Sequence, residues 1–295
     1  MQDNTKGKIL AALTSLIFGF SFIFTKTGTS TVPVLELLGW RFMMAFIFFE
    51  LIRRLLKIPL NFSRPGKRDL ILLGLFFPVL YFSLESLGIR DTTASEAGVI
   101  LSIGPIVTML LSSILLREFP RKDQFIGIFL STLGVIIMVL TKRNQPSFSY
   151  FGYLMLISGV FSYSFYSIIQ RKLQDFTVYE RTYFMLGIGA LVFFGSALLV
   201  ALTKGQAANF LSLPIKNKDF LVSILYLSLL SSNVAFLMNV SAIGLIGPTA
   251  TSSFSGLTTL TSVLAGVILL NEEFIGYQWL AAGLIILGVF LANKE

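Results

Sequence analysis

The chain has 295 residues, of which 55% are hydrophobic and only 13% charged, and its mean hydropathy is +0.81. An average soluble domain is about 25% charged, so this composition predicts an all-α membrane protein. The chain contains no Cys and no His, which excludes disulfides, thiol chemistry and imidazole catalysis, and we expect neither a metal nor a cofactor. The net charge of +8 does not indicate nucleic-acid binding, because no soluble basic face is predicted to carry it.

The first apolar run follows Lys6 and Lys8, as in a signal peptide, but no small-x-small cleavage pattern ends it. We therefore expect this run to remain as the first of several membrane spans. A helix needs about 20 residues to cross the hydrocarbon core. Apolar runs between charged or Gly/Pro-rich breaks predict ten spans, in chain order Ile9–Phe24, Val34–Leu56, Leu70–Ile89, Ala94–Leu116, Phe125–Leu140, Tyr150–Ile169, Tyr183–Leu202, Phe220–Ile243, Thr249–Leu270 and Tyr277–Ala292.

The Lys and Arg residues between the spans predict the orientation. If the N-terminus lies in the cytoplasm, basic residues on the cytoplasmic side outnumber those on the outer side by about two to one. Arg53, Arg54, Arg121 and Lys122 are among those on the cytoplasmic side. This distribution favours a multi-pass protein of the cell membrane with both termini in the cytoplasm.

The two halves of the chain share a sequence pattern. At a shift of 154 residues, Leu115-Leu116-x-Glu118 aligns with Leu269-Leu270-x-Glu272. Nearer the start of each half, a shift of 145 residues aligns Gly7 with Gly152 and Lys26 with Arg171. Further pairs at the shift of 154 are Gln124 with Gln278, Gly134-Val135 with Gly288-Val289, and Phe82 with Phe236.

These matches predict two repeats, residues 1–143 and residues 144–295, each with five helices. Because five is odd, the second repeat enters the membrane from the opposite side, and the two repeats are inverted. Charge agrees, since the connection with Arg117 and Arg121 is predicted inside whereas its counterpart carries Glu272 and Glu273 and is predicted outside. Inverted repeats are typical of transporters that bind substrate near the middle of the membrane, between the repeats.

Several motifs together resemble the drug/metabolite transporter superfamily, in particular its ten-helix members with two EamA-type repeats. These motifs are Gly19 in Phe18-Gly19-Phe20-Ser21-Phe22, Lys26 at the end of the same helix, Arg41, Pro105 in Ser102-Ile103-Gly104-Pro105, and the two Leu-Leu-x-Glu blocks with their following Gln. The resemblance covers almost the whole chain. The chain departs from the family at Phe18, where Trp is frequent, and at Thr259, the position that corresponds to Pro105.

The resemblance implies a secondary active transporter that works by alternating access and exports small metabolites such as amino acids. It implies a substrate path between helices one to four and helices six to nine of the chain, with helices five and ten at the periphery. The expected partners are a small-molecule substrate and the lipid bilayer, while proton coupling and a homodimer stay open. The alternatives are a non-transporting receptor or scaffold and a facilitative channel.

Enzyme classes are disfavoured by the residues that they would need. An intramembrane aspartyl protease needs two Asp inside helices, but the Asp residues lie at helix ends or in loops: Asp3, Asp69, Asp91, Asp123, Asp175 and Asp219. Metalloproteases and Ser–His proteases need His, which is absent. The chain has no Walker A motif to bind ATP. We therefore predict that the protein is not an enzyme and has no catalytic residues.

Ionisable side chains within the predicted spans are the first candidates for a functional site, because each costs about 2.5–3.5 kcal/mol on membrane insertion scales. Arg41 and Glu85 are predicted to line the path, where Arg41 would bind a carboxylate and Glu85 an ammonium group or a coupling proton. The competing structural hypothesis is an Arg41–carboxylate bridge between helices. Glu36 and Glu96 are candidates for a gate or an ion pair, or for solvation at the membrane surface.

Aromatic and amide side chains complete the candidate path. Tyr81 is four residues before Glu85 and shares its helix face. The remaining candidates are Phe18 and Phe22 on the first helix, Tyr163 and Tyr166 on the sixth, and Asn233, Phe236 and Asn239 on the eighth. The Ser and Thr residues of the ninth span either join helices or line a polar cavity.

Two further features concern structure alone. Glu118 and Glu272 are each expected near the N-terminus of the next helix, where a negative charge is favourable. Pro78 and Pro105 are expected to kink the third and fourth spans, since proline removes a backbone donor.

Overall fold

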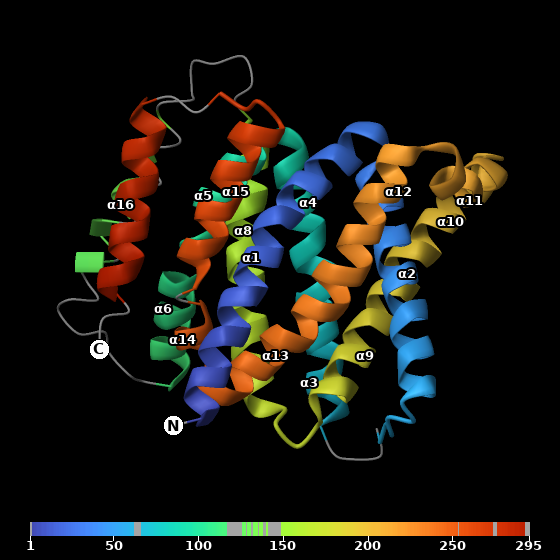
Figure 1. The fold of residues 1–295 in the computed structure, drawn as a ribbon, viewed down its shortest axis with the longest axis horizontal. Coiled ribbons are helices and arrows are strands. Elements are labelled where there is room, and N and C mark those ends of the chain that lie inside the picture. The colour runs from blue at the N-terminus through green and yellow to red at the C-terminus, as the bar shows by residue number, and fades with distance from the viewer. Residues whose placement is uncertain are drawn as a thin grey trace.

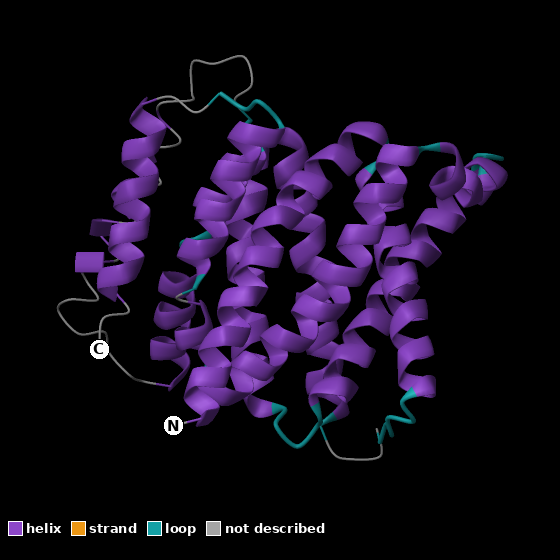
Figure 2. Cartoon of the chain, viewed as in Figure 1, coloured by secondary structure: helices purple, strands orange, loops and turns teal. Residues whose placement is uncertain are grey.

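The computed structural model describes residues 2–61, 66–116, 149–252, 254–273 and 276–292, with short stretches between 126 and 140. All regular secondary structure in these ranges is helical (Figure 2). The fifth predicted span, Phe125–Leu140, is described only in these short helical stretches, and Glu118 lies outside the described residues.

Helices before residue 117 lie where the spans were predicted, although the first one extends seven residues beyond Ile9–Phe24 at each end. Residues 67–91 form one span in three pieces, and residues 94–116 form one in two pieces. The helices are α1 (Gln2–Thr31), α2 (Val34–Leu55), α3 (Lys67–Gly74), the π-helical segment η1 (Leu75–Leu80), α4 (Tyr81–Asp91), α5 (Ala94–Leu101) and α6 (Gly104–Leu116).

The second half of the chain has a similar order of elements. Residues 178–203, 218–246 and 248–269 again form spans in several pieces. The helices are α8 (Tyr150–Lys172), α9 (Val178–Gly189), η2 (Ala190–Phe194), α10 (Gly195–Thr203), α11 (Ala207–Lys216), α12 (Lys218–Leu225), η3 (Tyr226–Val234), α13 (Ala235–Ile246), α14 (Pro248–Ser252), α15 (Ser255–Leu269) and α16 (Gly276–Ala292).

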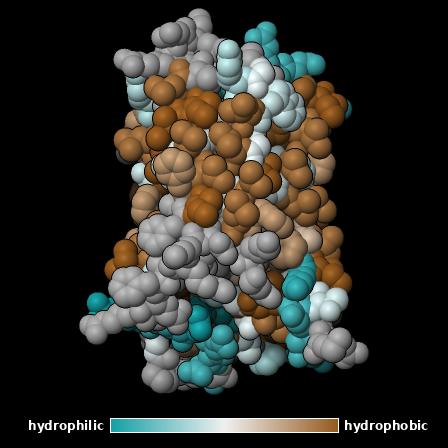
Figure 3. Space-filling model, turned by 90° about the vertical axis from the view of Figure 1, so that its left-hand side faces the viewer, coloured by the Kyte–Doolittle hydropathy of each residue, from teal (hydrophilic) through white to brown (hydrophobic). Residues whose placement is uncertain are grey.

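Seven of the described helices are long and apolar enough to cross a membrane, and the shorter apolar helix Gly276–Gly288 accompanies them. The helix α2 has sufficient length but carries several charged residues, including Arg41 and Glu50. Large apolar side chains point outward from the bundle, such as Leu191 with 76% of its surface exposed. Figure 3 shows one face that is hydrophobic across its middle and hydrophilic near both ends. The chain is therefore a multi-pass membrane protein.

The third span is broken at the predicted proline. Phe77, directly before Pro78, has φ −147° and ψ 109°, which are not helical values. Because the helix is broken here, the Phe76 carbonyl needs a partner from another helix, and the Ser162 hydroxyl of α8 donates to it at 2.8 Å. Pro105 lies in the first turn of α6, after the gap that separates α5 from α6. The expectation of breaks at both prolines is confirmed.

Two glycine contacts relate the halves of the chain. Gly7 of α1 packs against Leu245 and Ile246 at the end of α13, where a Cβ atom would come within 2.5 Å of Ile246. Gly152 of α8 packs in the same way against Asp91 and Thr92 at the end of α4. The glycines differ by 145 positions and their partners by 154, which are the two shifts found in the sequence. Each half therefore packs its first helix against the other half.

The aromatic core lies where the halves meet. Phe82 of α4 and Phe236 of α13, which correspond in the repeat, stack on each other with ring centroids 5.8 Å apart. Phe77 contacts both of them and stacks on Tyr166 at 4.3 Å. Figure 1 shows α4 and α13 crossing the middle of the bundle, with α1 beside them.

The connection between α10 and α12 contains a helix that the apolar runs did not predict. This helix, α11, lies at the edge of the bundle (Figure 1). Its Phe210 is buried against Trp40 of α2, and the Trp40 indole donates to the Phe210 carbonyl at 3.1 Å. On the opposite side of α11, Ile215 is 89% exposed. The helix α11 is therefore docked on α2 through Phe210 and also carries an exposed apolar side chain.

Candidate functional site

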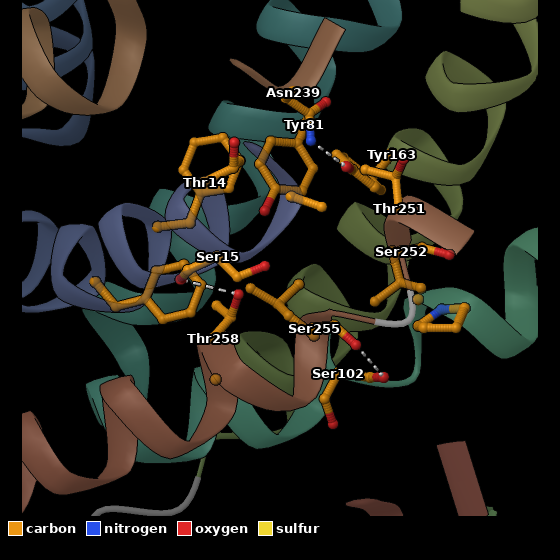
Figure 4. A pocket seen from close by; sticks show the side chains of 18 residues that line it. Thr14, Ser15, Tyr81, Ser102, Tyr163, Asn239, Thr251, Ser252, Ser255 and Thr258 are labelled. Atoms are coloured by element: carbon orange, nitrogen blue, oxygen red, sulfur yellow. Dashed lines mark hydrogen bonds between the residues drawn. The ribbon is translucent and has the colours of Figure 1, made fainter. Parts of the chain in front are cut away.

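A cavity lies among helices from both halves of the chain, and its empty space is about 640 Å³ when the part open to solvent is included. The described residues that line it carry hydroxyl, amide, aromatic and aliphatic groups but no charge. Figure 4 shows the polar side chains directed around a common space. They come from α1, α4, the connection between α5 and α6, α8 and the region of α13 to α15. The complete lining is Ala11, Thr14, Ser15, Phe18, Phe22, Tyr81, Gly98, Leu101, Ser102, Gly104, Pro105, Val160, Tyr163, Asn239, Thr251, Ser252, Ser255 and Thr258.

One face of α1 forms a long wall of the cavity. Ala11, Ser15, Phe18 and Phe22 follow each other at spacings of three or four residues, which places them on one side of a helix. The backbone of this wall also takes part, because the Thr258 hydroxyl of α15 donates to the Ser15 carbonyl at 3.1 Å. The candidates Phe18 and Phe22 therefore lie at the cavity, whereas Ser15 and Thr14 were missed. The sequence did contain a sign of both residues, since Thr14 and Ser15 precede Phe18 by four and three positions and therefore share its helix face.

Asn239 of α13 connects the cavity to a buried hydrogen-bond chain. Its amide nitrogen donates to the Tyr163 hydroxyl at 3.1 Å, and its amide oxygen accepts from the Tyr166 hydroxyl at 3.2 Å. Gln170 donates to Tyr166 at 3.2 Å and accepts from the Arg181 guanidinium at 2.8 Å. Tyr163 and Asn239 line the cavity, while Tyr166 does not line it and is connected to it through its hydrogen bond to Asn239. The buried Arg181 was not predicted, because it lies in the first turn of α9 and resembles a loop cation.

Tyr81 joins the cavity to Glu85. Its hydroxyl donates to a Glu85 carboxylate oxygen at 2.8 Å, as their spacing along one helix face allows. Glu85 itself is 2% exposed and does not line the cavity, and its second oxygen has no hydrogen-bond partner among the described residues. A substrate in the cavity would therefore reach the carboxylate through Tyr81.

Arg41 lies away from the cavity, with no exposed surface. Its Nε donates to the Ser232 hydroxyl at 2.9 Å and its Nη2 to the Ser231 hydroxyl at 3.0 Å. The guanidinium carbon lies 4.1 Å from the centroid of the Phe82 ring, a cation–π contact. The alternative of a direct Arg41–carboxylate bridge finds no support, since within the described residues no carboxylate oxygen lies within ion-pair distance of Arg41.

Two further path candidates serve the helix packing. Asn233 of η3 donates to the Ala45 carbonyl at 3.1 Å and to the Ser228 carbonyl at 2.9 Å, so it joins η3 to α2. Phe236 lies in the aromatic core against Phe82. Neither residue lines the cavity.

The two gate candidates have different surroundings. Glu96 is 3% exposed, caps α5 together with Thr93, and accepts from the Gln278 amide at 3.2 Å. The alternative of a solvated Glu96 is therefore wrong, because α16 supplies a buried partner. Glu36 is half-buried in the first turn of α2, where a negative charge is favourable.

Glu272 caps a helix, but not the next one along the chain. Its carboxylate accepts from the backbone nitrogens of Ala94 and Ser95 at 2.8 and 2.9 Å, and from the Ser95 hydroxyl at 2.6 Å. The expectation of a helix N-terminus is confirmed, yet the helix is α5 of the other half rather than α16. The sequence places α16 nearest in the chain, whereas the bundle places α5 nearest in space.

Comparisons with known proteins agree with this architecture. Residues 5–140 and 150–294 each match the model of the EamA-like transporter family. The transporter YcxC of Bacillus subtilis is 31% identical over 294 residues, which cover 99% of this chain and 94% of YcxC. A probable amino-acid metabolite efflux pump of Escherichia coli is 24% identical over 294 residues, covering 98% and 95% of the two chains.

One solved crystal structure has the same fold. It shares 17% sequence identity, covers 97% of this chain and 96% of its own, and superposes with a TM-score of 0.66. The family match, the relatives and the apolar helices together make the chain a membrane transporter. The chain belongs to the EamA-like transporter family.

Proposed function

We propose that the protein is a secondary active transporter that exports small metabolites such as amino acids by alternating access. The cavity carries this proposal, because it is built from α1, α4, α5 and α6 of one family match and from α8, α13, α14 and α15 of the other. A site shared by two repeats can be exposed to either side by rocking one repeat against the other. The efflux-pump name of the Escherichia coli relative supports export and amino-acid cargo.

The proposed topology has ten spans in two inverted repeats, residues 1–143 and 144–295, with both termini in the cytoplasm of a cell-membrane protein. The matching glycine contacts of α1 and α8 support the repeats. The distribution of Lys and Arg supports the orientation.

The lining favours small, amphiphilic cargo without a net charge. Hydroxyl groups and the Asn239 amide offer both hydrogen-bond donors and acceptors, and Phe18, Tyr81 and Tyr163 offer aromatic surface. A zwitterionic amino acid fits this chemistry, since its carboxylate can accept hydrogen bonds from hydroxyl and amide N–H groups, its ammonium can donate to hydroxyl and amide oxygens, and its side chain can pack on the rings. We place its binding site at Asn239 and Tyr163.

Transport of a panel of amino acids and organic cations into and out of proteoliposomes tests the proposal. An Asn239→Ala variant is expected to raise the apparent KM for a transported amino acid by about 3- to 10-fold, because one or two hydrogen bonds are lost. Asn209→Ala on the exposed surface of α11 is the control and is expected to transport normally. No transport of any panel member by the unmodified protein would contradict the proposed function.

Glu85 is the proposed coupling group for a proton. It is a buried carboxyl group one hydrogen bond from the cavity, so protonation can respond to occupancy through Tyr81. Glu85→Gln is expected to abolish stimulation of transport by a pH gradient while basal exchange continues. Glu36→Gln, at the half-buried start of α2, is expected to keep the stimulation. A Glu85→Gln variant with unchanged pH dependence would rule out this role.

A further inference from the structure

One end of the bundle is held by a lysine from α1. Lys26 Nζ donates to the carbonyl oxygens of Ile89 and Arg90 at 3.0 and 2.9 Å, and also to that of Thr92. These carbonyls end α4, where the helix dipole favours a cation and the last carbonyls have no partners within the helix. Lys26 therefore fastens α1 to the end of α4.

The same end is closed from the second half of the chain by Glu272, which caps the N-terminus of α5. The α4–α5 connection is thus held by a cation on one side and an anion on the other. Close packing continues below it, because a Cβ atom at Gly98 would overlap the Ser262 side chain of α15. Lys26 lies one turn beyond Phe22, a residue of the cavity wall, so this closure lies between the cavity and that face of the bundle.

At the opposite end of the bundle, the corresponding residue makes no such contact. Lys26 corresponds to Arg171 of α8 at the shift of 145, and residues 89, 90 and 92 correspond to residues 243, 244 and 246 of α13 at the shift of 154. Gly7 and Gly152 obey the same two shifts in their packing, so the correspondence holds in three dimensions. Arg171 is exposed, and in the described part of the chain it has no hydrogen bond or ion pair.

In Figure 1, α1 runs away from the N-terminus to its end near α12, whereas α8 ends near the start of α9, so these two helices end at opposite ends of the bundle. Lys26 lies in the last turns of α1 and Arg171 in the last turn of α8. The bundle is therefore latched at the Lys26 face and unlatched at the Arg171 face. Lys26 and Arg171 occupy equivalent positions in the two repeats, but among the described residues only Lys26 makes its contact in this state. If the two repeats exchanged conformations, Arg171 would make the equivalent contact and Lys26 would lose it.

We propose that Lys26 and Arg171 are alternating latches: when Lys26 releases the end of α4, the Arg171 guanidinium binds the terminal carbonyls of α13 and closes the opposite face. This inference rests on the proposed alternating access. Both residues act as positioning residues, since neither lines the cavity. Each latch stabilises one state, so removing it shifts the population toward the other.

Side-specific labelling of the cavity tests the latches. The chain has no Cys, so Ser15→Cys in the cavity wall gives the protein its only thiol. Its reaction with a membrane-impermeant maleimide added at the Lys26 face measures how often that face opens. Lys26→Met is expected to raise this rate by about tenfold and Arg171→Met to lower it by about tenfold, which is the value of one hydrogen-bonded charge.

Two controls separate a latch from a loss of folding. Lys26→Arg retains a cation for the α4 carbonyls and is expected to restore the low labelling rate. Lys218→Met removes an exposed lysine at the start of α12 and is expected to change nothing. Arg171 is exposed, so its substitution leaves the fold intact and tests the proposal even if Lys26→Met unfolds.

Labelling from the Lys26 face that Arg171→Met leaves unchanged would overturn the alternating latches. The same holds if Lys26→Met and Lys218→Met behave alike. Absence of transport with latch-dependent labelling would instead contradict the proposed function and keep the latches, so the two failures are distinguishable.

Discussion

Arg41 shows how single buried residues support this bundle. The guanidinium has no exposed surface, and two of its nitrogens donate to the hydroxyls of Ser231 and Ser232. We predict that Ser232→Ala lowers the free energy of unfolding by about 1–3 kcal/mol, because a buried cation loses an acceptor. Thermal unfolding in detergent measures the change. Ser228→Ala is the matched control in η3, since among the described residues that buried hydroxyl donates only to the Leu225 carbonyl, one turn earlier at the end of α12. Equal losses in both variants would show that the Arg41 contact adds nothing.

Glu272 offers a second test on the scale of a residue. Its carboxylate accepts three hydrogen bonds at the start of α5, and two of them come from backbone nitrogens. Glu272→Gln is expected to lower the free energy of unfolding by about 1–2 kcal/mol, because it removes the charge that favours this helix terminus. The exposed neighbour Glu273→Gln should leave the melting temperature unchanged. If both variants have the same melting temperature, the Glu272 cap does not stabilise the protein.

Individual residues of the cavity were predicted unevenly from the sequence. Aromatic and amide side chains inside apolar runs stand out, and Phe18, Tyr163 and Asn239 indeed line the cavity. Arg41 also stands out in the sequence, but it does not line the cavity. The free-energy cost of burying a charge marks such a residue as unusual, but it does not predict which neighbouring side chains bind it. Hydroxyl side chains such as Ser15 were missed, since Ser and Thr in a membrane helix bond equally well to their own backbone.

The broken third span illustrates the next scale, that of helical elements. The helix is broken at Phe77, and the Phe76 carbonyl accepts a hydrogen bond from the Ser162 hydroxyl of α8. Ser162→Ala is expected to destabilise the protein by about 1–3 kcal/mol, since a backbone acceptor loses its partner in an apolar region. Differential scanning fluorimetry can compare it with Ser167→Ala, a buried serine of α8 that bonds within its own helix to Tyr163. A larger loss for Ser167→Ala would refute this account of the break.

Spans were predictable as elements because a bilayer demands about 20 apolar residues from each. The helix α11 was not predictable, because its ten residues include Pro214 and its Phe210 is buried through tertiary contacts with Trp40 and Phe194. Glu272 was assigned to α16 rather than α5 for a similar reason: the pairing of helices from different halves is a tertiary property.

On the scale of the whole molecule, the two halves hold each other through equivalent glycines. Gly7→Ala and Gly152→Ala are each expected to lower the melting temperature, because the new methyl group would lie 2.5 Å from Ile246 or 2.8 Å from Thr92. Overpacking of this kind costs about 1–3 kcal/mol. Gly195→Ala, where no atom lies within 4 Å, is expected to leave stability unchanged or raise it. Tolerance of Ala at both Gly7 and Gly152 would contradict the shared packing.

The exchange of first helices between the halves also constrains how the protein is made. The main partner of α1 is α13, which begins at Ala235, about 200 residues after α1 has left the ribosome. At about 5–20 residues per second, translation needs about 10–40 s to cover that distance. During this interval α1 is in the membrane without its main partner and has only its contacts with the helices of its own half, such as α4 and α5. The bundle closes only when the last third of the chain has been inserted.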